Sequence, residues 1–136
     1  MIEDDSKYYA PDAEFIEALA QAAIASLPTM TCQAASVITL KVQDFISDEH
    51  FEELGLEDPY ELSGLYQSVM PNDRLGDEQR IAHPVIWLFR RPILDEWSER
   101  GNICLADLVK HVLVQELAHH FDWDDRDIAA LDPLPD

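Results

Sequence analysis

The chain has 136 residues, enough for one domain that buries roughly two thirds of the surface its unfolded form exposes. Its 28 acidic and 9 basic residues give a formal net charge of −19, which argues against binding nucleic acid or anionic membranes through a basic patch. The N-terminus lacks the order of a secretory signal and no apolar run could cross a bilayer, so we expect a cytoplasmic protein. Cys32 and Cys104 form no C-x-x-C pair, and we expect both to be small buried residues.

The first third of the chain predicts an arm, a helix and a strand. Residues 1–11 are polar and predict a loose N-terminal arm. Pro11 and the acidic residues after it open an amphipathic helix, which Pro28 ends. After a link of small residues, segment 36–42 is β-branched and alternates between two faces, which predicts a strand.

The middle of the chain predicts a short helix and two strands. Residues 48–54 form the helical candidate, closed by a glycine. Segment 62–69 predicts a strand that contains Gly64, and glycine inside a strand marks a bulge or a close approach of another backbone. Residues 70–82 predict a long loop, and the apolar run 84–89 predicts a strand buried on both faces.

The last part of the chain predicts a short helix over 93–100 and a long one over 105–121. Steps of about 100° per residue place seven side chains of the long helix in one broad, core-facing stripe: Leu105, Leu108, Val109, Val112, Gln115, Glu116 and His119. Three of these are polar, and burying them unpaired costs roughly 1–3 kcal/mol each, so we expect them to be satisfied by each other, water or an ion. The sequence predicts a compact α+β domain in which the N-terminal helix and this long helix pack on a small mixed sheet.

Residues 115–120 read Q-E-L-A-H-H, which is the helical zinc-protease pattern H-E-x-x-H with glutamine in place of the first histidine. Two imidazoles four residues apart on a helix point the same way and can hold one metal ion. The glutamate beside the first ligand then removes a proton from the metal-bound water. Gln115 does not suit this scheme, because its amide nitrogen has no free lone pair and its carbonyl oxygen is a weak, neutral ligand.

The stretch 115–125 resembles the zincin-like metallopeptidase family of small bacterial proteins, whose pattern is H-E-x-x-H-x-x-G-x-x-D. Further segments, 58–66, 88–92 and 108–114, are similar to the family's segments in the same order. The resemblance spans residues 12–132 and leaves 133–136 as a tail.

The resemblance implies a minimal zincin-like fold and a role for each matching residue. Glu116 falls on the general base, and His119 and Asp125 fall on the second and third zinc ligands. Gln115 occupies the first ligand position, so we expect the affinity for zinc to be reduced. Asp122 replaces the glycine of the turn, which aspartate tolerates better than most residues because it visits left-handed backbone conformations.

The other histidines offer no clear replacement for the missing ligand. His111 faces the same side as Gln115 but lies two turns from His119, roughly 12 Å along the axis. We expect His120 to be a packed or surface histidine. The isolated His50 and His83 are expected to be structural as well.

Four aspartates after the motif also have a second interpretation, as a solvated tail or as caps of a short final helix: Asp122, Asp124, Asp125 and Asp127. Arg90 and Arg91 could bridge to these carboxylates or anchor a ligand. We expect the three tryptophans to lie in the core: Trp87, Trp97 and Trp123.

Three functions follow as hypotheses. The first is a zinc-dependent peptide hydrolase with a degenerate, weakened site. The second is a non-catalytic relative that binds a peptide or protein in the groove beside Glu116, since zincin-type peptidases bind extended substrates along a sheet edge. The third is an acidic protein that recognises a basic partner through its charge.

Overall fold

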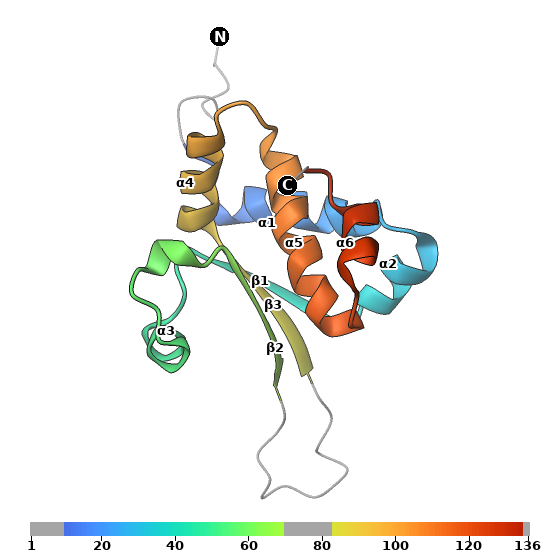
Figure 1. Ribbon diagram of the computed structural model, residues 1–136, viewed down its shortest axis with the longest axis horizontal. Helices are drawn as coiled ribbons and strands as arrows, with labels where there is room; N and C mark the ends of the chain where they lie inside the picture. The colour runs from blue at the N-terminus through green and yellow to red at the C-terminus, as the bar shows by residue number, and fades with distance from the viewer. Residues whose placement is uncertain (1–9, 70–82, 135–136) are drawn as a thin grey trace, which may run out of the picture.

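The computed structural model describes residues 10–69 and 83–134. The loop predicted over 70–82 and most of the arm over 1–11 therefore lie outside the described residues, whereas of the tail over 133–136 the first two residues are described and Leu134 packs against the core. Within them the elements follow one another as shown in Figure 1: α1 (Ala13–Ala25), α2 (Thr29–Ala35), β1 (Thr39–Gln43), α3 (Asp48–Leu54), the 3-10 turn η2 (Pro59–Glu61), β2 (Gly64–Val69), β3 (His83–Phe89), α4 (Arg90–Arg100), α5 (Leu105–Phe121) and α6 (Asp125–Leu131).

The three strands form one mixed sheet in the order β1-β3-β2. β1 runs parallel to the central strand β3, and β2 runs antiparallel to it. The β2–β3 register runs from Gly64 opposite Leu88 to Val69 opposite His83 without an extra residue in either strand. The strand glycine therefore marks no bulge, and β2 is left as an edge strand.

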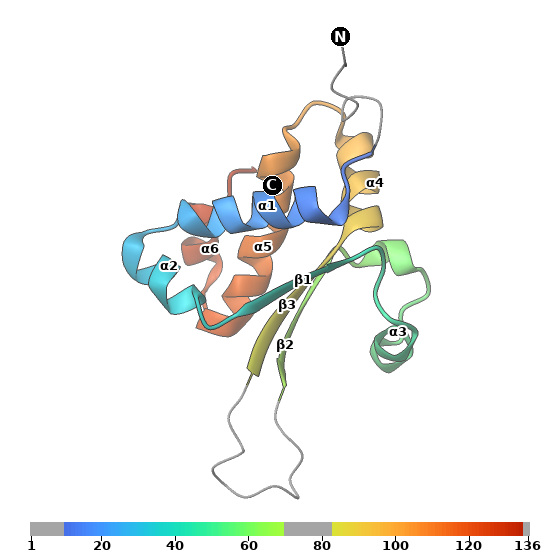
Figure 2. The same cartoon turned by 180° about the vertical axis from the view of Figure 1, so that it is seen from behind.

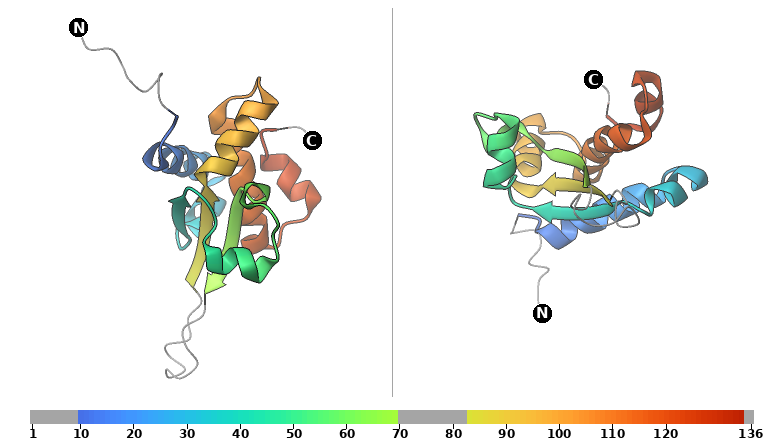
Figure 3. Two further views of the ribbon diagram at one scale, coloured as in Figure 1. Left: turned by 90° about the vertical axis from the view of Figure 1, so that its left-hand side faces the viewer. Right: turned by 90° about the horizontal axis from the view of Figure 1, so that it is seen from below.

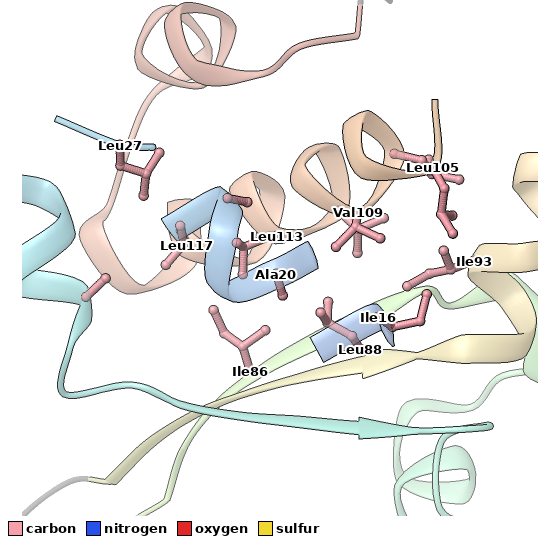
Figure 4. Packing of buried hydrophobic residues seen from close by; sticks show 14 of the residues in the cluster. Ile16, Ala20, Leu27, Ile86, Leu88, Ile93, Leu105, Val109, Leu113 and Leu117 are labelled. Carbon is pink, nitrogen blue, oxygen red and sulfur yellow. The ribbon is translucent and has the colours of Figure 1, made fainter. Parts of the chain in front are cut away.

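Helices α1 and α5 cover the same face of this sheet, as the two views in Figures 2 and 3 show. α1 packs against β1, whereas α5 packs against β2, β3 and α1. The core between them gathers apolar side chains from both helices and the central strand (Figure 4): Ile16, Ala20, Ile86, Leu88, Val109, Leu113 and Leu117. The compact α+β domain with two helices on a small mixed sheet is confirmed.

Local signals explain where several elements begin and end. The Asp12 carboxylate accepts a hydrogen bond from the Phe15 N–H at 2.9 Å and caps α1. Ser47 caps α3 in the same way, and Gly55 ends that helix in the left-handed conformation with φ of 66°. The predicted bounds of α3 and α5 are confirmed.

Several element boundaries differ from the prediction, among them the start of β2 at Gly64 and not at residue 62 and the start of β3 at His83 and not at residue 84. The link of small residues forms helix α2, because alanine has the highest helix propensity and Ala35 can pack into the core. β1 consequently starts at Thr39 and not at residue 36. α4 begins at Arg90, three residues earlier than predicted, with Pro92 in its first turn, where a missing N–H breaks no helical hydrogen bond.

The prediction that β3 is buried on both faces is confirmed only in part. Ile86 and Leu88 are fully buried under the helices, whereas on the opposite face Phe89 is buried but Val85 and Trp87 are half-buried. The Trp87 indole N–H donates to Gln67 at 3.1 Å, and the Lys41 ammonium lies 5.1 Å from its ring centre. Amphipathic side chains, and not a second layer of helices, therefore cover this face of the sheet.

The other buried-residue predictions are confirmed only in part. Trp97 and Trp123 pack against the core while remaining partly accessible. Cys32 does the same, but Cys104 is exposed just before α5, so its predicted burial is wrong. In residues 10–69 and 83–134, no helix has the length and apolar content required to cross a membrane.

Candidate functional site

Helix α5 lies directly against the bare backbone of β2. A Cβ atom built on Gly64 would meet Val112 Cγ1 at 2.9 Å, Glu116 Cγ at 3.2 Å and Trp87 O at 3.3 Å. The first of these distances is shorter than any ordinary contact, so only glycine permits this spacing of helix and strand. The close approach predicted at Gly64 is confirmed, although its closest atoms belong to side chains of α5 and not to another backbone, and it brings the motif helix to the edge of the sheet.

Glu116 is the buried acid of this interface. Its side chain is 15% exposed and lies 4.0 Å from His119, measured from Oε1 to Nε2. Burial raises the pKa of the Glu116 carboxyl above its ordinary value, while the nearby His119 and a hydrogen bond from the Tyr66 backbone N–H act in the opposite direction. The predicted general base therefore sits between α5 and the edge strand.

Gln115 is tied to the C-terminal end of the described chain. Its Nε2 donates to Asp132 Oδ2 at 3.3 Å, and His111 Nδ1 lies 2.7 Å from the same oxygen. The Leu134 N–H donates to Asp132 Oδ1 at 3.0 Å. With three partners the Asp132 side chain is only 6% exposed. The amide nitrogen at the first ligand position is thus committed to a carboxylate, and His111 and Gln115 face the same side as predicted.

Asp132 was missed by the sequence reasoning. It follows α6 and precedes Pro133, a combination that signals a turn but no chemical role. Its partners lie 17 and 21 residues earlier in the chain, on the facing helix. Only the packing of α6 on α5 reveals that these three polar side chains form one cluster.

His119 does not lie in the core-facing stripe, and that prediction is wrong. Its side chain is 68% exposed. The buried side chains of α5 spread further round the helix than one stripe: Leu105, Leu108, Val109, Val112, Leu113, Val114 and Leu117. Because α1 packs on α5 in addition to the sheet, the buried arc turns away from His119 toward Leu113 and Leu117.

The segment after α5 contains a tight turn and a capped helix. Asp122 adopts the left-handed conformation with φ of 57°, which is where the resemblance expects a glycine. Asp124 and Asp127 accept hydrogen bonds from each other's backbone N–H at 2.9 and 3.1 Å and form a capping box. The cap interpretation is therefore confirmed for these two aspartates. Asp125 is the exposed first residue of α6.

Two hollows flank Gln115. The larger, a cavity of about 620 Å³, is lined by Gln115, Asp125 and Asp132 together with apolar residues of α6 and the segment after it. The smaller, a cleft of about 170 Å³, lies between α5, α4 and the start of β2, and Glu116 lines it. Asp125 thus shares a cavity with Gln115, whereas Glu116 faces the other hollow.

Two of the remaining histidines and the two arginines have structural partners. His120 Nδ1 lies 2.8 Å from the Tyr66 hydroxyl, and His50 bonds the Gln67 amide at 3.1 Å, whereas His83 is exposed at the start of β3. The predicted link between the arginines and the C-terminal carboxylates is wrong. Arg90 Nε donates to Asp44 at 2.8 Å, and the Arg91 side chain contacts Tyr60 of η2, just before the start of β2.

The family of zincin-like metallopeptidases matches residues 35–134, more than half of the chain. The chain belongs to the zincin-like metallopeptidase family. No curated protein matches it. The matched region runs from the end of α2 through the motif helix to the Asp132 cluster, so the family membership covers the whole site.

The site of this zincin-like protein does not fit a tetrahedral zinc ion. Zinc sites with nitrogen and oxygen donors combine imidazoles with a carboxylate at about 2 Å from the metal. Here the motif supplies one imidazole, which is exposed, and one amide already bound to Asp132. In the part of the chain that the structure describes, no three His, Cys, Asp or Glu side chains gather closely enough for one ion.

Proposed function

We propose that this chain is a zincin-like relative with a degenerate metal site, so that zinc-dependent hydrolysis of peptide bonds is weakened or abolished. Instead of cleaving peptides, the chain binds an extended peptide or protein segment in the groove beside Glu116. The observation that carries this proposal is the state of Gln115. It stands at the first ligand position, and its amide nitrogen is hydrogen-bonded to Asp132.

The chemistry of the donors supports the loss of metal affinity. An amide oxygen is a weaker ligand for zinc than imidazole, and the rest of the Gln115 amide cannot coordinate. Losing even an outer hydrogen-bonding partner of a metal ligand costs roughly 10–100-fold in affinity or activity. The loss of an inner ligand therefore costs at least as much.

The edge of the sheet supports the proposal that the chain binds a peptide. The Phe89 N–H donates to the Ser63 carbonyl at 2.9 Å, so Ser63 faces β3. In an antiparallel pair the direction alternates along the strand, so the backbone groups of Gly64, Tyr66 and Ser68 face away from β3. The Tyr66 N–H bonds Glu116, and among residues 10–69 and 83–134 no other group bonds the outward backbone groups of Gly64 and Ser68, which can therefore pair with an added strand.

Zinc content and peptide cleavage test the proposal together with the variant Gln115→His. We expect the native protein, purified without added metal, to hold less than one zinc ion per chain by elemental analysis. It should cleave a fluorogenic peptide pool slowly or not at all in excess zinc. Gln115→His restores an imidazole beside Glu116, so its zinc affinity should rise by about tenfold or more.

A matched control is Gln21→His, which adds an imidazole on the exposed surface of α1. It should leave zinc binding unchanged. Stoichiometric zinc together with chelator-sensitive cleavage by the native chain would refute the loss of catalysis. Equal zinc affinity of Gln115→His and the native chain would show that position 115 is not a former ligand position.

A further inference from the structure

The site also indicates which peptide it takes. We propose that the bound segment carries a lysine or arginine side chain, which enters the small cleft at the start of β2 and pairs with the Glu116 carboxylate. This inference rests on the proposed function, because it assumes that a peptide lies along the β2 edge. It adds the chemical class of the partner, a basic segment.

The cleft lies where a side chain of an added strand would enter. It is lined at the strand end by Ser63 and Gly64, on α4 by Glu96, and on α5 by His111, Gln115 and Glu116. Gly64 has no side chain of its own and turns its backbone groups outward. The side chains of Val112 and Glu116 cover Gly64 from α5, so a residue paired near this glycine would direct its side chain past it, beside Glu116, into the cleft.

The polar groups of this cleft are hydrogen-bond acceptors. Gln115 uses its Nε2 on Asp132, which leaves its Oε1 free to accept. The Asp132 carboxylate next to His111 Nδ1 favours the tautomer with the proton on that nitrogen, so that Nε2 accepts. Together with the Glu116 carboxylate, these atoms match an ammonium or guanidinium group, which carries only donors.

Glu116 lacks a cation to balance its burial. Its side chain is 15% exposed, and the imidazole of His119, which carries charge only when protonated, is 4.0 Å away and largely exposed. Within residues 10–69 and 83–134, no lysine or arginine lies within ion-pair distance of it. Glu96 is already paired with Arg100 at 2.8 Å. A buried carboxylate without a partner is costly, and a ligand cation removes that cost.

Charge complementarity at longer range favours the same class of partner. The chain carries a formal net charge of −19. Such a field attracts basic segments and repels acidic ones before contact. The cleft then discriminates at short range, because an acidic side chain would meet acceptors and a carboxylate.

The test uses three nine-residue peptides of alternating Thr and Val that differ only at the central position, which is lysine, norleucine or glutamate. Binding to the full chain is measured by fluorescence anisotropy in a buffer with a chelator at about 0.15 M salt. We expect the lysine peptide to bind about tenfold or more tightly than the norleucine peptide, and the glutamate peptide most weakly.

The variant Glu116→Gln distinguishes attraction of lysine by the cleft from attraction by the negative charge of the whole chain. It removes the charge but keeps an oxygen for the Tyr66 N–H, so it should abolish the preference for lysine over norleucine while norleucine binding persists. The control Glu53→Gln removes one charge from exposed α3 and should leave the preference intact.

The outcomes distinguish this inference from the function it rests on. If no peptide binds, the proposed peptide-binding function fails and this inference fails with it. If lysine and norleucine peptides bind equally well, peptide binding in the groove is supported. The proposal that a basic side chain enters the cleft is then overturned. A lysine preference that survives undiminished in Glu116→Gln also overturns it, because the attraction then comes from the whole charged surface.

Discussion

The fold buries the carboxylate of Glu116, and this burial disfavours its charged form. Burial raises its pKa, and neither the exposed His119 nor one backbone N–H compensates fully. A general base in a working zincin benefits from such a site because metal and substrate neutralise its charge in turn. Here the same burial remains while the metal ligands are altered, so Glu116 is better placed to bind a cation.

Glu116→Gln should therefore stabilise the chain at neutral pH. Because the folded pKa lies above the unfolded value, ionisation favours the unfolded state, and the cost is full above the folded pKa. The cost declines as the pH falls through the folded pKa and disappears below the unfolded value. The melting temperature of the variant should exceed that of the native chain at pH 7, with a gain that shrinks toward about pH 4.

The exposed variant Glu53→Gln is the control for the change in net charge. It should show a smaller gain without the same dependence on pH. A Glu116→Gln variant that is less stable than the native chain at pH 7 would contradict the cost of burying this carboxylate.

Asp132 holds the polar cluster of the site together. Asp132→Ala would leave His111 and Gln115 without their shared acceptor, and the Leu134 N–H without its partner. We expect a loss of about 1–3 kcal/mol in the free energy of unfolding, measured by urea denaturation. Asp95→Ala, on the exposed side of α4, should change it by less than about 0.5 kcal/mol. Equal losses in the two variants would show that the cluster contributes nothing.

At the residue scale the sequence predicted the common side of His111 and Gln115 and the left-handed turn at Asp122. The first follows from helical spacing, and the second from the place of the glycine in the family's pattern, which the resemblance carries onto Asp122. The exposure of His119 and the role of Asp132 depend on which helices pack against α5 from elsewhere in the chain. Spacing along a single helix does not contain that information.

At the scale of elements, the contact between α5 and β2 determines the site. Gly64→Ala would place a methyl group 2.9 Å from Val112 Cγ1 and force helix and strand apart. We expect a loss of about 1–3 kcal/mol in the free energy of unfolding, as for other overpacked positions. Peptide binding should weaken as well, because the cleft narrows.

Ser68→Ala on the same strand is the control, since Ser68 is exposed and its backbone is unchanged. Its unfolding free energy should stay within about 0.5 kcal/mol of the native value. If Gly64→Ala is as stable as the native chain, the helix can move away from the strand without cost, and the close approach is not a structural requirement.

The predicted elements succeeded where a local signal was strong and failed where packing decided. Helix α5 and helix α3 were predicted with their bounds because periodicity and a glycine cap define them. Helix α2 was missed because a run of small residues becomes helical here by packing Ala35 into the core. The extra turn of α4 was missed because proline stops a helix in one position and starts it in another.

At the scale of the whole molecule, the net charge of −19 is a repulsive term that folding must overcome. Salt screens this repulsion, since the Debye length falls from about 30 Å at 0.01 M to about 8 Å at 0.15 M. The melting temperature should therefore rise by several degrees between these salt concentrations. Scanning fluorimetry in sodium and potassium chloride would measure it, and equal effects of the two salts indicate screening.

A melting temperature that falls with added salt would mean that ion pairs such as Arg90–Asp44 outweigh the repulsion. The Asp44 side chain of this pair is 57% exposed and that of Arg90 is 18% exposed, and an ion pair that reaches solvent contributes little to stability. The hydrophobic core between α1, α5 and β3 remains the main stabilising feature, and it does not weaken with screening.

Helix α6 is closed at its N-terminus by its own capping box, at Asp124 and Asp127, and is tied to α5 just after its C-terminus by the bonds of Asp132 to His111 and Gln115. To swing away from α5 it would have to give up both of these bonds. They hold the wall of the 620 Å³ cavity that α6 and the segment after it form against Gln115. A ligand of this cavity would be selected by its size, because α6 does not move to fit it. The protein would then lose little conformational entropy on binding.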